Sequence, residues 1–227
     1  PYVITSTTPL ADMVRRVHPE AQVQVVPNVV SAHWLEQGSA TCRPWAPGDQ
    51  RIIRYLPGSK FHEPDFAVAA PGLAAYLRAS PAAHLEIVGP VSTEGYGFPP
   101  RQVSHRKAVP FEHLPALLAS SWVTIAPLLD SPFTRCKSAI KFLESAAFGC
   151  PCIASPIPDM ERCVAGGVVL ASAADAWEAS LRAFEDAEYR MAVGQQGSAW
   201  VLGTATTRGA GAIYSRTLDT WLAQHAG

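Results

Sequence analysis

Short apolar runs alternate with helix-length segments from residue 51 onward. Strands are predicted over residues 51–56, 84–88, 122–127, 152–155 and 168–170. Helical patterns are predicted over residues 64–79, 112–120, 137–148, 160–165, 175–185, 187–201 and 211–224. Because two parallel neighbouring strands need a connection as long as a helix, this alternation predicts an α/β fold with a doubly wound parallel sheet.

The start of the chain predicts a smaller unit of the same kind. A strand over residues 2–6, a helix over 9–17 and a strand over 23–26 form a β-α-β unit that stops at a proline. Residues 31–50 are dense in turn residues and lack apolar periodicity, so we expect a linker or an extended surface crossing. Residues 91–104 are rich in glycine and proline and predict a loop.

Composition excludes several classes of protein. Of the 227 residues, 48% are hydrophobic and 16% are charged, against a usual charged share of roughly 25%, which indicates a globular chain. A net charge of −1 lacks the basic excess of a nucleic-acid binder, so no nucleic-acid partner is expected. No apolar run reaches roughly 18 residues and no signal peptide is present, so a soluble, cytoplasmic protein is expected. The five cysteines lack metal or disulfide spacing and are expected to be reduced.

The turn after the first strand of the main alternation is the first candidate site. Ligands of doubly wound sheets bind outside the carboxyl ends of the strands. Gly58 would let backbone amides of Ser59 and its neighbours approach an anion, and Lys60 would supply charge, which fits a phosphate contact. His62 could contact phosphate or sugar. A solvated turn, and a surface or core histidine, remain the alternatives.

The predicted helix over residues 137–148 is the second candidate. Lys137, Lys141 and Glu144 stand at i, i+4 and i+7 and share one face. Lys137 and Ser138 are expected in the first turn, where free amides and the helix dipole favour anions. A diphosphate at the helix start and a sugar hydroxyl at Glu144 would both be matched. The alternative is a solvated face with a Lys141–Glu144 pair.

The turn over residues 155–161 is the third candidate. Glu161 or backbone amides there could lie near a ligand, or Glu161 could be an ordinary acidic residue at a helix start. The histidines form no metal-like spacing, and no pair of aspartates has the spacing of a metal site. We therefore expect no metal.

One long segment resembles the signature of a known enzyme family. Residues 141–155 read KFLESAAFGCPCIAS, a glutamate followed by small residues, Gly-x-Pro and a strand ending in Ala-Ser. This resembles the retaining family 4 (group 1) glycosyltransferases of the GT-B fold. Residues 25–29, 58–60, 85–89 and 109–111 with 114–115 resemble further segments of that family in the same order, so the match spans nearly the whole chain.

The resemblance implies a Rossmann-like second domain of a GT-B glycosyltransferase, which holds the nucleotide sugar. Glu144 would bond ribose hydroxyls, the turn at Gly58 with Ser138 or Lys141 would hold the diphosphate, and the segment at Val109 would contact the base. The complete set of expected nucleotide-sugar-binding residues is Gly58, Ser59, Lys60, His62, Val109, Phe111, Lys137, Ser138, Lys141 and Glu144.

The resemblance also implies a division of the chain. Residues 1–30 correspond to the last β-α-β unit of an N-terminal acceptor domain, 31–49 to a linker, 50–200 to the nucleotide-sugar domain and 201–227 to a C-terminal helix. The larger part of the acceptor domain is missing, so this chain alone is expected to be inactive. The family commonly has a second glutamate eight positions before the first, and this chain has Cys136 there.

The implied reaction is transfer of a sugar from a nucleoside diphosphate to an acceptor with retention of configuration, without a metal or other cofactor. A glycan or a lipid-linked acceptor, a place in polysaccharide biosynthesis and peripheral membrane association of the full-length protein are expected. The alternatives are a non-catalytic nucleotide-binding or scaffolding domain, and an epimerase or phosphorylase of the same fold.

Overall fold

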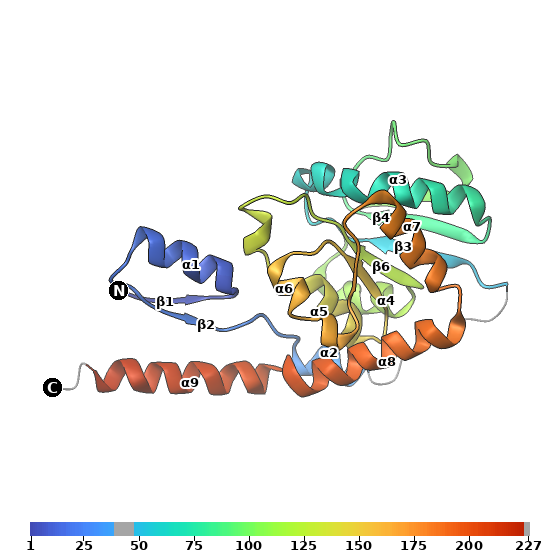
Figure 1. Cartoon of the computed structure of the whole chain (residues 1–227). Helices are drawn as coiled ribbons and strands as arrows, with labels where there is room; N and C mark the ends of the chain where they lie inside the picture. The colour runs from blue at the N-terminus through green and yellow to red at the C-terminus, as the bar shows by residue number, and fades with distance from the viewer. Residues whose placement is uncertain (39–47, 225–227) are drawn as a thin grey trace.

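A computed structural model describes residues 1–38 and 48–224, and its centre is a six-stranded sheet (Figure 1). Every pair of neighbouring strands in this sheet is parallel. The strands are β3 (Arg51–Tyr55), β4 (Ala83–Val88), β5 (Val103–Arg106), β6 (Val123–Ala126), β7 (Cys152–Ala154) and β8 (Val169–Leu170). The predicted α/β fold with a doubly wound parallel sheet is confirmed.

The strand order β5-β4-β3-β6-β7-β8 places the first strand in the middle. From β3 the chain builds the sheet outward through β4 and β5, and then returns to add β6 on the other side of β3. The carboxyl ends of β3 and β6 are therefore adjacent where the winding reverses. Such a switch point is where open α/β sheets bind ligands.

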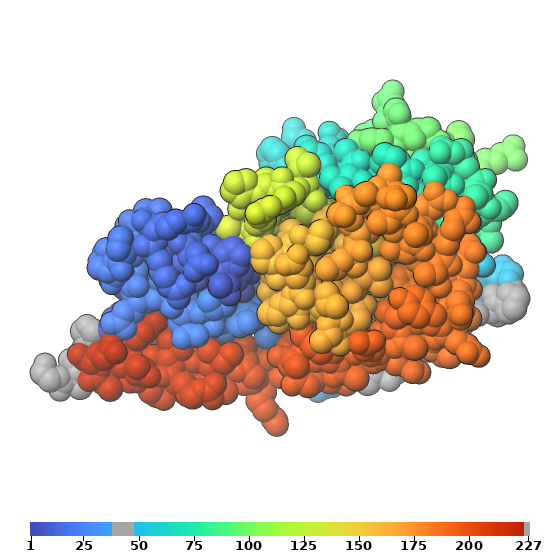
Figure 2. Space-filling view, viewed as in Figure 1, coloured from blue at the N-terminus to red at the C-terminus, as the bar shows by residue number. Residues whose placement is uncertain are grey.

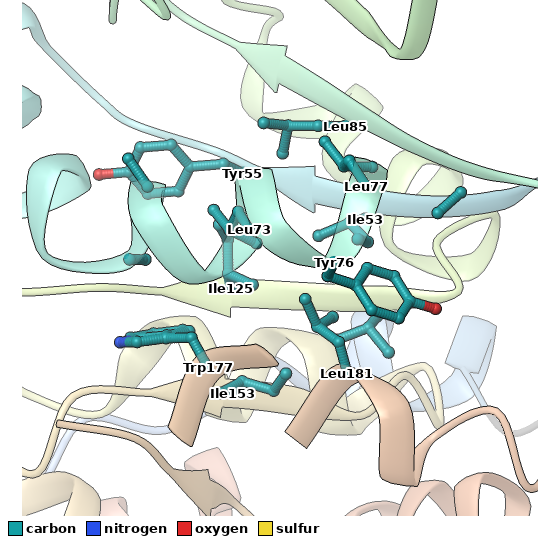
Figure 3. Packing of buried hydrophobic residues seen from close by; sticks show 14 of the residues in the cluster. Ile53, Tyr55, Leu73, Tyr76, Leu77, Leu85, Ile125, Ile153, Trp177 and Leu181 are labelled. Atoms are coloured by element: carbon teal, nitrogen blue, oxygen red, sulfur yellow. The ribbon is translucent and has the colours of Figure 1, made fainter. Parts of the chain in front are cut away.

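Helices cover both faces of the sheet. On one face lie α3 (Glu63–Ala79) and α7 (Ala174–Ala183), on the other α2 (Ala32–Gly38), α4 (Leu114–Ala119), α5 (Ile140–Ala147) and α8 (Ala187–Thr204). Strand residues alternate between the two cores: Ile153 packs in the first, and Cys152 and Ala154 pack in the second. Figure 3 shows the first core, where α3 and α7 contribute Leu73, Tyr76, Leu77, Trp177 and Leu181.

The predicted N-terminal β-α-β unit is confirmed. It consists of β1 (Tyr2–Thr5), α1 (Thr8–Val17) and β2 (Gln22–Val25), and the two strands form a parallel sheet of their own. The last helix, α9 (Thr207–Ala223), runs alongside this unit (Figures 1 and 2). The ring of Tyr2 lies 4.5 Å from that of Trp221.

Three predicted elements are wrong in detail. Residues 32–38 form α2 where a linker without helical structure was predicted, because Trp34 packs into the second core. The predicted loop over residues 91–104 runs into β5, which pairs with β4. The helix predicted over residues 137–148 begins only at Ile140, after a 3₁₀ turn (η4, Thr134–Cys136) and an extended Lys137.

Smaller elements complete the chain. The helix predicted over residues 112–120 is the end of the 3₁₀ turn η3 (Phe111–His113) followed by α4. The helix predicted over residues 160–165 is the end of α6 (Pro158–Glu161) followed by the start of the 3₁₀ turn η5 (Val164–Gly166). Two further 3₁₀ turns are η1 (Lys60–His62) and η2 (Pro100–Gln102). Residues 39–47 of the predicted linker, with Cys42, and residues 225–227 lie outside the described residues. The division into domains stays a prediction.

The cysteines that the structure describes are free thiols. Cys150, Cys152 and Cys163 are buried, and Cys136 is half-buried. Burial raises the pKa of Cys150 and Cys152 to about 12, so both are protonated at neutral pH.

Candidate functional site

A first pocket lies at the carboxyl ends of β3, β4 and β5. It has a volume of about 340 Å³, and we call it the lysine pocket. It brings together four of the predicted residues: Gly58 after β3, Val109 after β5, and Lys141 and Glu144 on α5. Its walls are otherwise apolar, and they include Leu114 at the start of α4.

Lys141 and Glu144 are the two ionisable side chains of the lysine pocket. Lys141 Nζ donates a hydrogen bond of 2.5 Å to the carbonyl oxygen of Leu56. Burial lowers the pKa of Lys141, and the negative charge of Glu144 opposes that shift. Burial likewise raises the pKa of Glu144, against the charge of Lys141. A cation and a hydroxyl acceptor thus lie side by side in the largely apolar lysine pocket. The alternative left open by the sequence was a solvated helix face.

A second pocket lies at the switch point, on the other side of the Gly58–Ser59 turn. It has a volume of about 510 Å³, and Ser59, His62, Asp65 and Lys137 supply its polar and charged groups together with Ser131 and Thr134. We call it the histidine pocket. Since Gly58 lines one pocket and Ser59 the other, a single turn separates them.

Asp65 joins three segments in the histidine pocket. Its Oδ1 accepts a hydrogen bond of 2.8 Å from the backbone N–H of Leu129. Its Oδ2 lies 2.8 Å from Nδ1 of His62 and 3.4 Å from Nζ of Lys137. The side chain of Asp65 is only 7% exposed, so these partners replace nearly all of its hydration.

The segment before α5 differs from the prediction. Lys137 and Ser138 precede the helix, so they are not in its first turn and Lys137 does not share a helix face with Lys141. The backbone N–H of Ala139 already donates to Oδ2 of Asp159, at 2.7 Å. Ser138 Oγ accepts a hydrogen bond of 2.8 Å from Nδ2 of Asn28.

Three other predicted residues line neither pocket. Lys60 is exposed in η1. Phe111 stacks on Trp34, with ring centroids 4.6 Å apart, and 62% of it remains exposed. Glu161 is exposed at the end of α6. The side chain of α6 whose carboxylate contacts the start of α5 is Asp159. The predicted binding roles of all these residues stay predictions.

Cys136, where the family commonly has a glutamate, contacts the N-terminal unit. Its Sγ lies 3.1 Å from Sδ of Met13, and its carbonyl oxygen accepts a hydrogen bond of 2.9 Å from Thr7 Oγ1. It also lines a cleft of about 650 Å³ between α1 and residues 130–136. The cysteine is therefore part of the contact between the N-terminal unit and the segment that precedes α5.

Sequence reasoning missed Asp65 and Asp159. Both are acidic residues in the first turn of a helix, which is a common and uninformative position. The three-residue spacing from His62 to Asp65 is the one local signal, because such a pair can meet at a helix start.

The described residues hold no group of three or more His, Cys, Asp and Glu side chains that could bind a metal ion. Among them, no helix combines the length and the apolar character needed to cross a membrane.

Similar folds occur among solved structures. A sucrose-phosphate synthase from Thermosynechococcus elongatus is 18% identical with a TM-score of 0.72, and the match covers 98% of this chain and 59% of that one. A glycosyltransferase from Rickettsia africae is 11% identical with a TM-score of 0.73, covering 97% and 62%. HepE of Anabaena, in complex with UDP and glucose, is 12% identical with a TM-score of 0.68, also covering 97% and 62%. At these identities the likeness shows the fold alone.

The chain spans about six tenths of the length of each of these structures. No curated protein matches it in sequence. The model of the family described as glycosyl transferases group 1 matches residues 65–186, which is more than half of the chain. The matched range includes the residues of α3 and α5 that line the two pockets. The chain therefore belongs to the group 1 glycosyltransferases.

Proposed function

We propose that this chain is the nucleotide-sugar-binding part of a retaining glycosyltransferase, corresponding to the C-terminal domain of a GT-B enzyme. The observation that carries the proposal is the lysine pocket, where Gly58, Val109, Lys141 and Glu144 meet at the carboxyl ends of the strands. A lysine suits a diphosphate, a glutamate suits ribose hydroxyls, and the apolar walls suit a base.

In the proposed reaction a sugar moves from a nucleoside diphosphate to an acceptor with retention of configuration. The nucleoside occupies the lysine pocket, and its diphosphate lies at the turn of Gly58 and Ser59. Lys141 and the backbone amides of that turn stabilise the negative charge that develops on the leaving diphosphate. Glu144 accepts hydrogen bonds from the ribose. These roles need no metal ion.

The wider setting is also a proposal. We expect a cytoplasmic protein whose acceptor, a glycan or a lipid-linked sugar, is bound with the help of an N-terminal domain, in polysaccharide biosynthesis with peripheral membrane association. Two structural neighbours support a UDP-sugar as the first donor to test. HepE is in complex with UDP and glucose, and the pneumococcal O-GlcNAc transferase GtfA is in complex with UDP and GlcNAc.

Thermal unfolding with a panel of nucleotides tests the binding site. A ligand present at 100 times its Kd stabilises a protein by about 2.7 kcal/mol, so UDP or another nucleoside diphosphate should raise the Tm measurably. Lys141→Met should abolish this shift, whereas Arg208→Met, which removes an exposed cation on α9, should keep it. No shift with any nucleotide would refute the proposal.

Gly58→Ala gives a second, independent variant. A Cβ at Gly58 meets open space, so the Tm of the free protein should not change. If a phosphate approaches the backbone there, the methyl group should weaken UDP binding. Unchanged UDP affinity in Gly58→Ala would show that the diphosphate does not bind at this turn.

The non-catalytic alternative predicts the same binding without turnover. Donor hydrolysis or sugar transfer, assayed across the donor panel, separates the two. The prediction that the 227-residue chain alone is inactive is tested in the same assay.

A further inference from the structure

The carboxylate of Asp65 is held in an arrangement that its position in the helix does not require. Asp65 is in the first turn of α3, where an acidic side chain ordinarily accepts hydrogen bonds from its own helix. Here Oδ1 instead accepts the N–H of Leu129, 64 residues away, and Oδ2 faces the ring of His62 and the ammonium of Lys137. The side chain therefore contacts groups across the histidine pocket.

The contact with Asp65 determines which ring nitrogen of His62 carries the proton. An ionised carboxylate only accepts hydrogen bonds, so Nδ1, at 2.8 Å from Oδ2, must be the N–H donor. In the neutral ring Nε2 is then an unprotonated acceptor. The His62 side chain is 21% exposed and lines the histidine pocket, so this acceptor is within reach of a ligand.

The charges of the cluster indicate what kind of group Nε2 receives. The charges facing His62 in the pocket are those of Asp65 and Lys137, and they lie 3.4 Å apart and compensate each other. While the ring of His62 is neutral the cluster has no net charge and does not favour a phosphate over water, and the unprotonated nitrogen offers an anion no hydrogen bond. An uncharged hydroxyl group is the matching partner, because its O–H can donate to Nε2.

We propose that Asp65 is a positioning residue of the donor site, which fixes His62 with its proton on Nδ1 so that Nε2 accepts a hydrogen bond from a hydroxyl of the donor's sugar. The inference rests on the proposed function, since it places the nucleoside in the lysine pocket and the sugar in the histidine pocket. The turn of Gly58 and Ser59 separates the two pockets, and the diphosphate there connects the two ends of the donor.

Nuclear magnetic resonance of the imidazole nitrogens tests the first half without any ligand. In the wild-type chain the proton of neutral His62 should be on Nδ1. In Asp65→Asn the amide oxygen keeps the hydrogen bond from Leu129, which turns the NH₂ group toward His62. That group donates to Nδ1, and the ring proton should move to Nε2. Glu63→Gln removes an exposed carboxylate two positions away and should leave the proton on Nδ1.

Calorimetric titration with UDP and with UDP-glucose or UDP-N-acetylglucosamine, whichever binds more tightly, tests the second half. The quantity of interest is the ratio of the Kd of UDP to the Kd of the UDP-sugar. One hydrogen bond corresponds to roughly a three- to tenfold change, so Asp65→Asn and His62→Ala should each lower the ratio by about that factor. Asp65→Asn should lower it no further in the His62→Ala background, because Asp65 acts through His62.

The outcomes separate the inference from the proposed function. If UDP binds but the ratio is the same in the wild type and both variants, the inference is wrong and the proposed function stands. Additive effects of the two substitutions, or a proton on Nε2 in the wild type, also overturn it. If no nucleotide binds, both fail. Should Asp65→Asn not fold, the wild-type proton position and the ratio in His62→Ala decide.

Discussion

Lys141 and Glu144 are one turn apart on α5, and burial acts on them in opposite directions. It lowers the pKa of Lys141 and raises that of Glu144, so each side chain is moved toward its neutral form. Their mutual attraction opposes both shifts. A diphosphate bound beside Lys141 would favour its charged form, which makes nucleotide binding sensitive to alkaline pH.

We predict that the affinity for UDP falls as the pH rises, and that the fall begins below the ordinary lysine pKa of roughly 10.4. The bound diphosphate needs charged Lys141, whose pKa in the free protein is lowered, so the charge is lost progressively as the pH rises through that lowered value. The terminal phosphate is fully ionised above about pH 7 and does not add to the change. Titration calorimetry between about pH 7 and 10 measures the Kd. Lys141→Arg, which stays charged, should show a smaller fall, because only the ionisation of the uracil ring of UDP then remains; a fall in the wild type no larger than that in Lys141→Arg would contradict the prediction.

At the scale of elements, contacts between distant segments decide where secondary structure begins and ends. Residues 103–106 contain a single apolar side chain, Val103, which is too little to predict a strand, and they become β5 because β4 offers an unpaired edge. The start of α5 is set by Asp159, whose carboxylate accepts the N–H of Ala139. In both cases the partner lies elsewhere in the sequence.

Two glycines in helices predict opposite effects of the same substitution. Gly72 of α3 faces α7, where an added Cβ would meet the carbonyl oxygen of Ala174 and lie 2.9 Å from Cβ of Trp177. Gly72→Ala should lower the free energy of unfolding by about 1–3 kcal/mol through overpacking. Gly203 of α8 faces open space, and Gly203→Ala should raise it by up to about 1 kcal/mol through helix propensity. Urea unfolding measures both, and equal effects would show that the close approach of α3 and α7 is not as described.

At the scale of the whole molecule, α9 links the two sheets. It follows α8, which packs in the second core, and it reaches the N-terminal unit through Trp221 and Gln224, whose Oε1 lies 3.3 Å from Tyr2 Oη. A two-stranded sheet is marginally stable by itself. The N-terminal unit therefore depends on α9 for part of its stability.

We predict that Trp221→Ala loosens the N-terminal unit without affecting the six-stranded sheet. Loss of the Trp221 ring, which packs tilted against the ring of Tyr2, removes an aromatic contact worth about 0.5–1.5 kcal/mol in addition to the apolar area that it buries. Hydrogen exchange should become faster in β1 and β2 and stay unchanged in β3, β4 and β6. Leu222→Ala, at a side chain that is 69% exposed, is the control and should change neither. Equal acceleration in both sheets would show that they unfold as one unit.

The sequence by itself determined the order of most helices and strands, the doubly wound parallel sheet and the resemblance to group 1 glycosyltransferases. These follow from local periodicity and from short motifs, which neighbouring residues carry. It also named Gly58, Val109, Lys141 and Glu144, which the structure brings into one pocket. Only the tertiary structure decided that Asp65 holds His62 and Lys137, that Asp159 meets Ala139, and that Lys137 precedes α5. The physical reason is that a buried carboxylate takes its hydrogen-bond partners from whichever segments the fold brings near it, and no local pattern records that choice.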